Sequence, residues 1–156
     1  MTWRGSTTVP DRIFASLPYL LPLVDGLAFG RFLFTQFPVL QLLLIPLAPL
    51  MQIYSLPFAS LIIFFALYLG VVRNENISHF IRFNAMQAIL LDIVLMLCRL
   101  VLQILEGPQV AFIAETLYNM VFLGAFAAFV YAVVQSLLGR YAEIPPLSDA
   151  VYMQVR

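Results

Sequence analysis

Long apolar segments alternate with short polar breaks along the chain. The 41 residues between Arg31 and Arg73 carry no charged side chain, and the more polar stretch 52–57 divides them. A helix rises about 1.5 Å per residue and needs about 20 residues to cross a ~30 Å hydrocarbon core. The pattern therefore predicts an all-α fold of membrane-spanning helices, drawn from five apolar segments: Ile13–Gly30, Phe32–Tyr54, Leu56–Val72, Phe83–Leu105 and Val110–Leu138.

Prolines interrupt the first two of these segments. The first contains Pro18 and Pro22, and the second contains Pro38, Pro46 and Pro49. An interior proline removes a helix hydrogen bond and costs about 3 kcal/mol in water. In a membrane the freed carbonyl groups must find other partners. We therefore expect kinked or re-entrant elements in the N-terminal half.

The arginines favour an even number of crossings, because cytoplasmic loops attract Arg and Lys. With five spans the flanking arginines divide two against five, whereas leaving out either 32–54 or 13–30 gives six against one or seven against none. This count leaves open which of the two is the first span, and we take 13–30. The sequence thus predicts an integral membrane four-helix bundle in one domain, 1–156, with both termini cytoplasmic. Its spans are about 13–30, 56–72, 83–105 and 110–138, with a re-entrant or interfacial segment 32–54 and a polar tail 140–156.

Composition supports a membrane protein. The chain is 63% hydrophobic and 10% charged with a mean hydropathy of +0.98, whereas soluble domains carry about 25% charged residues. Disorder is excluded because it needs low hydrophobicity and high charge. The eight basic residues are all arginine and form no basic run. A nucleic-acid interface is therefore not indicated.

Charged groups within the segment 83–105 point to a polar site. A charge near the centre of a spanning helix costs about 2.5–3.5 kcal/mol, and this segment carries Asp92 and Arg99. It should therefore need a partner or a wet cavity. At 100° per residue, Asn84 and Gln103 fall on the same face as this pair. A structural network, the polar lining of a translocation path and a proton or ion relay all fit this pattern.

Two further carboxylates lie in other segments, Asp25 in the first and Glu115 in the last. The candidate intramembrane polar face thus comprises Asn84, Asp92, Arg99, Gln103, Asp25 and Glu115. In the last segment, a row of small side chains spaced four apart lets a neighbouring helix approach closely. These candidate helix-packing residues are Gly124, Ala128 and Ala132.

Enzyme signatures are missing from the sequence. His79 and Cys98 are the single residues of their types, so a zinc or haem site is not indicated. There is no Gly-x-Ser-x-Gly, phosphate loop or His-Glu-x-x-His. We therefore expect a protein without catalytic residues, metal or cofactor.

One stretch is distinctive enough to compare with known families. Residues 71–92 contain the core Arg-Phe-Asn-Ala-Met-Gln-Ala at 82–88 and end at Asp92. Further matching residues are Arg-Ile at 12–13, Leu-Pro-Tyr-Leu-Leu-Pro at 17–22, Asp-Gly at 25–26, Gln-Phe-Pro at 36–38, Pro-Phe at 57–58 and Phe-Ala-Leu-Tyr at 65–68. On these residues the chain resembles the twenty-kilodalton Tic family, the membrane subunit of the chloroplast inner-envelope import translocon, and its cyanobacterial relatives.

The resemblance implies four transmembrane helices with both termini stromal or cytoplasmic. It also implies a role in moving precursor proteins across the membrane, as part of a channel with partner subunits, and it supplies no catalytic residue. Because the sequence starts at Met1 without a transit peptide, we expect a bacterial or plastid-encoded member. Its location would be the cyanobacterial plasma membrane or the plastid inner envelope.

The preferred hypothesis is therefore a non-enzymatic subunit of a protein-translocation channel. Its expected partners are the lipid bilayer, other translocon subunits or further copies of itself, and a translocating polypeptide. Four helices surround too little volume to admit a polypeptide alone, so a pore would need such partners. Two alternatives stay open: a membrane-complex scaffold, and a small ion or solute transporter that uses the intramembrane carboxylates and the cation among them, namely Asp25, Asp92, Arg99 and Glu115.

Overall fold

The structure is a computed structural model that describes residues 7–145 and 147–155, and these residues form helices and loops without a strand. The expected all-α fold is confirmed. In chain order the helices are α1 (Val9–Ser16), η2 (Leu17–Tyr19), α2 (Leu20–Leu27), η3 (Ala28–Gly30), α3 (Arg31–Gln36), η4 (Pro38–Leu44), α4 (Ala48–Tyr54), α5 (Ala59–Leu67), η5 (Tyr68–Val72), α6 (His79–Ile104), η6 (Pro108–Val110), α7 (Ala111–Leu137) and α8 (Leu147–Gln154).

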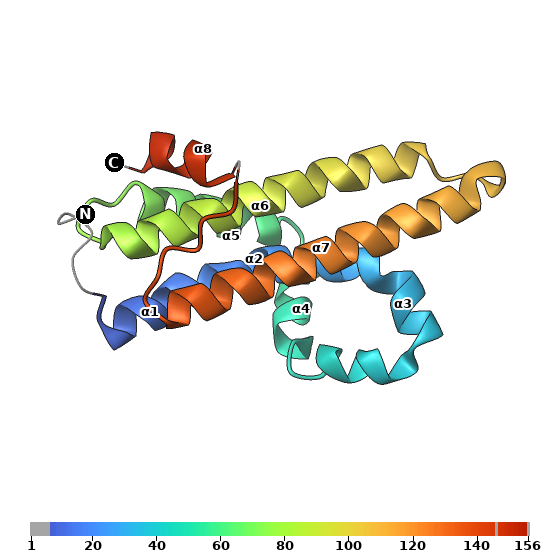
Figure 1. Cartoon of the computed structure of the whole chain (residues 1–156), viewed down its shortest axis with the longest axis horizontal. Helices are drawn as coiled ribbons and strands as arrows, with labels where there is room; N and C mark the ends of the chain where they lie inside the picture. Colours follow the sequence, from blue (N-terminus) through green and yellow to red (C-terminus); the bar gives the residue numbers. More distant parts are fainter. Residues whose placement is uncertain (1–6, 146, 156) are drawn as a thin grey trace.

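The first five helical pieces join into one continuous helix, the first rod, Val9–Gln36, which is long and apolar enough to cross a membrane and whose last piece, α3, bends away (Figure 1). The rod begins at a capping box, in which the Thr8 hydroxyl accepts from the Asp11 backbone N–H and the Asp11 carboxylate accepts from that of Thr8. Pro18 lies in the 3₁₀ turn η2, and Pro22 lies one turn later in α2. The prolines therefore tighten the rod without ending it.

Helices α6 and α7 form a long antiparallel hairpin (Figure 1). They contain 26 and 27 residues, which correspond to about 40 Å each. The Ser78 hydroxyl caps α6 by accepting from the Ile81 backbone N–H, so the helix starts before residue 83. Arg82, expected in a loop, is instead buried in the first turns of α6. Its Nε donates to the Val72 carbonyl at 2.9 Å.

The segment 56–72 is not the straight span that the sequence suggested. Its helix, Ala59–Val72, rises only about 21 Å, which is less than the ~30 Å core. It meets α4 at a 98° bend. Pro57 cannot donate a helix hydrogen bond, and Phe58 adopts a left-handed conformation with φ of 62°. In the part of the chain that the structure describes, three helices can thus cross a membrane by length and composition, or four if the bent pair counts as one span.

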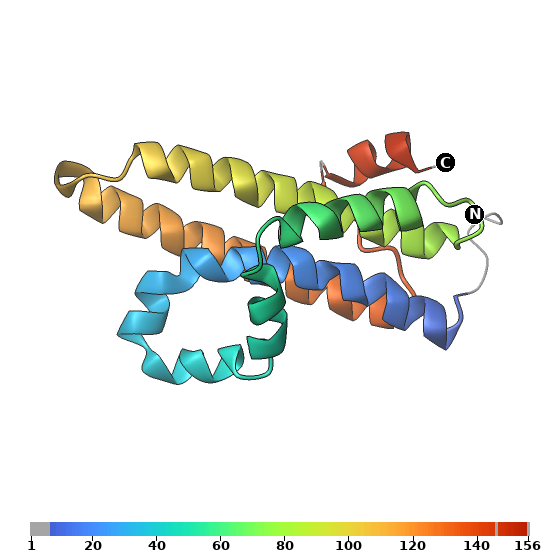
Figure 2. The ribbon, with the colours of Figure 1, turned by 180° about the vertical axis from the view of Figure 1, so that it is seen from behind.

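The segment expected to be re-entrant, 32–54, consists of short helical pieces. Figure 2 shows α3, η4 and α4 curving away from the long helices and returning to α5. Most of its apolar side chains are exposed, including Val39, Ile45 and Ile53. The segment thus leaves the long helices and rejoins them, and its depth in a bilayer stays a prediction.

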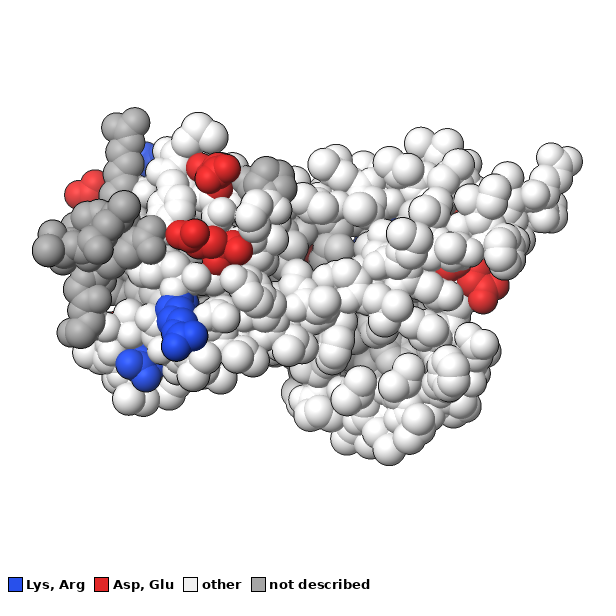
Figure 3. Space-filling model, viewed as in Figure 1, with Lys and Arg blue, Asp and Glu red and all other residues white. Residues whose placement is uncertain are grey.

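The ends of the helices divide into two groups. The start of α1, the loop 73–78, the end of α7 and α8 gather at one end, and the α6–α7 loop lies at the other (Figures 1 and 2). Figure 3 shows most of the charged side chains on that face at the first end, a further acidic patch near the other end, and a largely uncharged surface between them. This distribution fits a protein whose middle lies in lipid.

The C-terminal region packs against α6. Val151 and Val155 are buried in a cluster with Phe83 and Met86 of α6 and with Val72. Part of the tail that was expected to be polar therefore forms an amphipathic helix, α8. It covers the end of α6 that carries the Arg-Phe-Asn-Ala-Met-Gln-Ala core.

Gly139 offers a test of this end of the fold. It has a φ of 76°, and a Cβ there would lie 2.9 Å from Arg12 Nε. We expect Gly139→Ala to lower the free energy of unfolding by about 1–2 kcal/mol, the cost of a left-handed non-glycine residue. Thermal unfolding in detergent, followed by circular dichroism, measures this change.

The matched control is Gly124→Ala, because nothing lies within 4 Å of a Cβ at Gly124. Alanine is the better helix former by about 1 kcal/mol, so this variant should melt at or above the wild-type temperature. Equal melting of the two variants would contradict the assigned backbone at Gly139.

Candidate functional site

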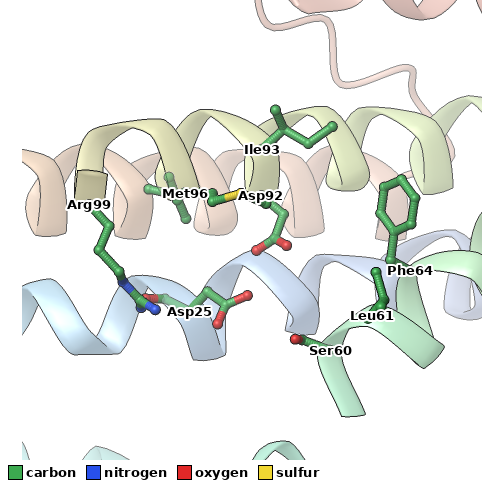
Figure 4. A pocket seen from close by; sticks show the side chains of 9 residues that line it. Asp25, Ser60, Leu61, Phe64, Asp92, Ile93, Met96 and Arg99 are labelled. Atoms are coloured by element: carbon green, nitrogen blue, oxygen red, sulfur yellow. The ribbon is translucent and has the colours of Figure 1, made fainter. Parts of the chain in front are cut away.

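Helices α2, α5 and α6 line a cavity of about 360 Å³. Asp25 of α2 and Asp92 of α6 both extend into the space between their helices, and Ser60 approaches from α5 (Figure 4). Arg99 lies two turns after Asp92 on the same face of α6 and closes one side of the cavity. The remaining walls are apolar, with Leu61, Phe64, Ile93, Leu95 and Met96.

The cavity lies at the middle of α6. Asp92 is residue 14 of the 26 in this helix, so it is about 20 Å from each end. On the facing helix, Gly26 follows Asp25 directly. A Cβ at Gly26 would lie 3.3 Å from the Ala125 Cβ, so the glycine lets α2 approach α7 closely. Helix packing thus fixes Asp25 opposite Asp92.

Arg99 connects α6 to α2. Its Nη2 donates to the backbone carbonyl of Asp25 at 3.3 Å, and its guanidinium lies 5.8 Å from the ring centre of Phe29. Over the described ranges, no ion pair within 4.0 Å joins Arg99 to Asp92. The Asp92 Oδ1 atom is buried and has no hydrogen-bond partner there. The cavity therefore contains a carboxylate oxygen with unused acceptor capacity.

Such an oxygen is costly to leave unpaired in a membrane, because burying a polar group without a hydrogen bond costs free energy. The cavity is polar on one side and large enough for several waters, each of which takes up about 30 Å³ in the liquid. Within residues 7–145 and 147–155, no three His, Cys, Asp or Glu side chains are grouped so that they could hold a metal ion. The site can accept hydrogen bonds from water or from a ligand. It can also bind a positively charged group of a ligand.

Asn84 belongs to a different site. Its Oδ1 accepts from the Tyr19 hydroxyl at 2.7 Å and from the Ser136 hydroxyl at 3.1 Å. Its Nδ2 donates to the Phe80 carbonyl at 2.8 Å. Asn84, Tyr19 and Ser136 are fully buried. This residue therefore joins the first rod, α6 and α7 through a satisfied hydrogen-bond network.

Gln87 extends this network to the chain after α7. Its Nε2 donates to the Tyr19 hydroxyl at 2.9 Å and to the Ala142 carbonyl, and its Oε1 accepts from the Ile144 backbone N–H. Gln87 and Tyr19 were not among the site residues predicted from the sequence. The available signal was the spacing of Asn84 and Gln87, three residues apart on one helix face.

A third polar group lies near the α6–α7 loop. Arg31 pairs with Glu106 at 3.2 Å, and the Tyr118 hydroxyl donates to the same carboxylate at 2.7 Å. The Arg31 guanidinium also lies 4.4 Å from the Tyr118 ring centre. The Tyr118 hydrogen bond, followed by the charge of Arg31, lowers the pKa of Glu106 below its ordinary value. This group ties the end of the first rod to the hairpin.

The other predicted polar residues lie outside the cavity. Gln103 is exposed on α6. Glu115 is half-buried on α7, one turn before Asn119, whose side-chain oxygen is buried without a partner in the described part of the chain. The structure thus brings together Asp25, Asp92 and Arg99. It adds Ser60, which no sequence pattern had linked to them.

The row of small residues on α7 is packed at one end only. Ala132 is buried in a cluster with Tyr19 and Ala88, whereas Ala128 is half-buried. Gly124 is exposed, and a Cβ added there would meet no atom within 4 Å. Within one chain, therefore, the row does not form a continuous helix–helix contact.

Replacing Gln87 tests whether the buried network stabilises the fold. We expect Gln87→Leu to lower the free energy of unfolding by about 1–3 kcal/mol, because it leaves the Ala142 carbonyl and the Tyr19 hydroxyl with fewer partners. Chemical denaturation in mixed micelles is the measurement. Gln103→Leu on the same helix is the control and should change stability by less than about 0.5 kcal/mol, since Gln103 is exposed. A Gln87 variant as stable as this control would refute the role of the network.

Comparison with known proteins identifies the family. Residues 7–151 match the family described as "Chloroplast import apparatus Tic20-like". The chain is 56% identical to a "Tic20 family protein" of Synechocystis sp., over 94% of this chain and 93% of that protein. It is 43% identical to "Protein TIC 20-II, chloroplastic" of Arabidopsis thaliana, over 99% of this chain and 78% of that protein.

A third relative comes from a red alga. The "Tic20 family protein Ycf60" of Porphyra purpurea is 33% identical, over 99% of this chain and 80% of that protein. The names describe components of an import apparatus and not enzymes. The resemblance found at residues 82–88 is thus confirmed, and the chain belongs to the Tic20 family of chloroplast import proteins and their cyanobacterial relatives.

Proposed function

We propose that this chain is a membrane subunit of a protein-translocation channel and that the cavity lined by Asp25, Asp92 and Arg99 faces the moving polypeptide. The observation that carries the proposal is this polar cavity at the middle of α6, in a chain whose helices are otherwise apolar enough to span a membrane. Family membership supports the proposal, because relatives are named as parts of an import apparatus.

The chemistry of the cavity suits a polypeptide in transit. A chain crossing the bilayer in an extended form exposes backbone N–H groups that find no partner in hydrocarbon. The unpaired Asp92 oxygen, together with the Asp25 carboxylate and the Ser60 hydroxyl, offers acceptors for those groups. The same carboxylates would also attract basic side chains of the polypeptide.

One chain is too small to form the whole channel. A helix about 10 Å wide that rises 1.5 Å per residue fills about 120 Å³ per residue, so a cavity of about 360 Å³ holds the equivalent of about three residues. A complete path therefore needs further copies or other subunits. The outward face of α7 is available to them, since Met120, Leu123 and Gly124 are all exposed.

We further propose that the end carrying α8 faces the cytoplasm or the plastid stroma. Arg12, Arg73 and Arg140 lie at this end, whereas Arg31 pairs with Glu106 at the other. Arginine-rich ends stay on the cytoplasmic side. The membrane would be the cyanobacterial plasma membrane or the plastid inner envelope, with segment 32–54 held within the bilayer or at its far surface.

Cysteine labelling tests this orientation. In a Cys98→Ala background, Asn76→Cys and Gln109→Cys place single thiols in the two opposite loops, and both positions are exposed. In intact cells a membrane-impermeant maleimide should label position 109 and spare position 76 until the membrane is permeabilised. Labelling of both positions, or of 76 alone, would contradict the proposed orientation.

Site-specific photocrosslinking tests the channel role. A photoreactive amino acid at Ser60 or Met96, both on the cavity wall, should capture an arrested precursor polypeptide during translocation. The matched control is Met120, which is exposed on the outward face of α7 and should capture lipid or a partner subunit. Equal capture of precursor at all three positions, or at none, would count against a path through the cavity.

Asp92→Asn separates this proposal from the transporter alternative, which the two cavity carboxylates also allow. A channel subunit with this substitution should show altered precursor crosslinking and no change in ion flux. A proton-coupled transporter should instead lose pH-dependent flux in reconstituted vesicles while its assembly stays normal.

A further inference from the structure

A second hollow lies beside a neighbouring face of α5. This groove, with a volume of about 490 Å³, runs between the first rod and α5. The α5 side presents Ile63, Leu67 and Val71 at successive turns, and the first rod presents Phe14 and Leu17. Figure 2 shows these two helices side by side. Helix α5 therefore contributes side chains both to this apolar groove and to the polar cavity.

Water is a poor occupant of the groove. Among the described residues that line it, Tyr54 alone carries a polar side-chain atom. A buried water needs two to four polar partners, which this lining does not supply. The rim residues Phe14 and Leu17 are 57% and 49% exposed, so the groove opens toward the surroundings of the protein. In a membrane those surroundings are hydrocarbon, and an apolar molecule should fill the groove.

The size of the groove selects a slender occupant. At about 120 Å³ per residue, a packed helix would fit only about four residues into this volume, roughly one turn. A spanning helix of a partner could therefore place only about one turn in the groove, whereas a single extended acyl chain is thinner than a helix and needs less volume per unit length. Its apolar surface also matches the lining.

An exposed cation near one end of the groove indicates which kind of lipid headgroup would lie there. Ile77, in the loop 73–78, lines the groove at the end where α8 and the start of α1 lie. Arg73 follows the lining residue Val71 by two positions and is exposed. Over the described ranges, no hydrogen bond or ion pair of its guanidinium is present. A cation at the membrane interface attracts an anionic lipid headgroup.

From these observations we infer that the groove between the first rod and α5 binds one acyl chain of an anionic membrane lipid whose headgroup lies at Arg73. The bound chain packs against α5, which lines two hollows and follows the bend at Phe58. This inference requires only that the protein lies in a membrane, and it does not depend on what the polar cavity conducts.

Photolabelling of the wild-type chain locates the lipid. The full-length protein is reconstituted in vesicles of phosphatidylglycerol with a diazirine group in the acyl chain, illuminated and digested. We expect adducts on peptides of the first rod and α5 to exceed those on the exposed face of α7 around Met120 to Val134. That face contacts bulk lipid, so it reports the non-specific level. Equal labelling of the two regions would overturn the inference.

Native mass spectrometry of the detergent-solubilised chain measures headgroup preference. We expect retention of one phosphatidylglycerol, with a preference over phosphatidylcholine of about fivefold, as one basic side chain near an anionic surface provides. Arg73→Gln should abolish this preference, whereas Arg140→Gln, an exposed arginine outside the groove lining, should keep it. Glu75 lies in the same loop, and its negative charge opposes the attraction of an anionic headgroup to Arg73. If the wild-type chain shows no preference for phosphatidylglycerol, the assignment of the headgroup to Arg73 is refuted.

Filling the groove tests the acyl-chain site. Leu67→Trp should remove retention of both lipids. If this variant does not fold, the smaller change Ile63→Phe replaces it and should weaken the retention of both lipids. Leu138→Trp, on an exposed side chain at the end of α7, is the size-matched control and should retain lipid. Undiminished retention in the groove variants, or a dimer of the chain in place of a bound lipid, would overturn the inference.

Discussion

The cost of burying polar groups in a low-dielectric membrane governs how this protein is built around α6. That helix carries polar side chains along its whole length, and these side chains find different kinds of partner at its start, at its middle and beyond its end. Near the α8 end, Asn84 and Gln87 are fully paired through Tyr19, Ser136 and the chain after α7. At mid-depth, Asp92 and Arg99 face a cavity. At the far loop, Glu106 meets Arg31 and Tyr118.

These three solutions have different consequences. The satisfied network fixes helices relative to one another, because every partner that is removed leaves another group unpaired. In the cavity, by contrast, hydrogen bonding is incomplete, because one Asp92 oxygen has no partner among the described residues. A buried carboxylate oxygen without a partner can accept a hydrogen bond from a polar ligand. Helix α5, which is short and bent from α4, lines both this cavity and the apolar groove.

Several features could be predicted from residues alone. Long apolar runs identified the hairpin of α6 and α7 within a few residues, and the motif at 82–88 identified the family. The 100° periodicity placed Asp92 and Arg99 on one face, which the shared cavity agrees with. The same periodicity placed Asn84 and Gln103 on that face as well, but one is buried in a network and the other is exposed. Periodicity gives the face of a helix on which a residue lies, but it does not show which neighbouring helix covers that residue.

By itself, the sequence determined the all-helical class, the membrane environment and the family, because these depend on composition, run length and local motif. The tertiary structure decided which polar groups meet. Asp25 reaches Asp92 only because α2 packs against α6 and α7, and Ser60 joins them only because the chain bends by 98° before α5. Periodicity is a property of one helix, whereas a cavity is defined by the distances between several.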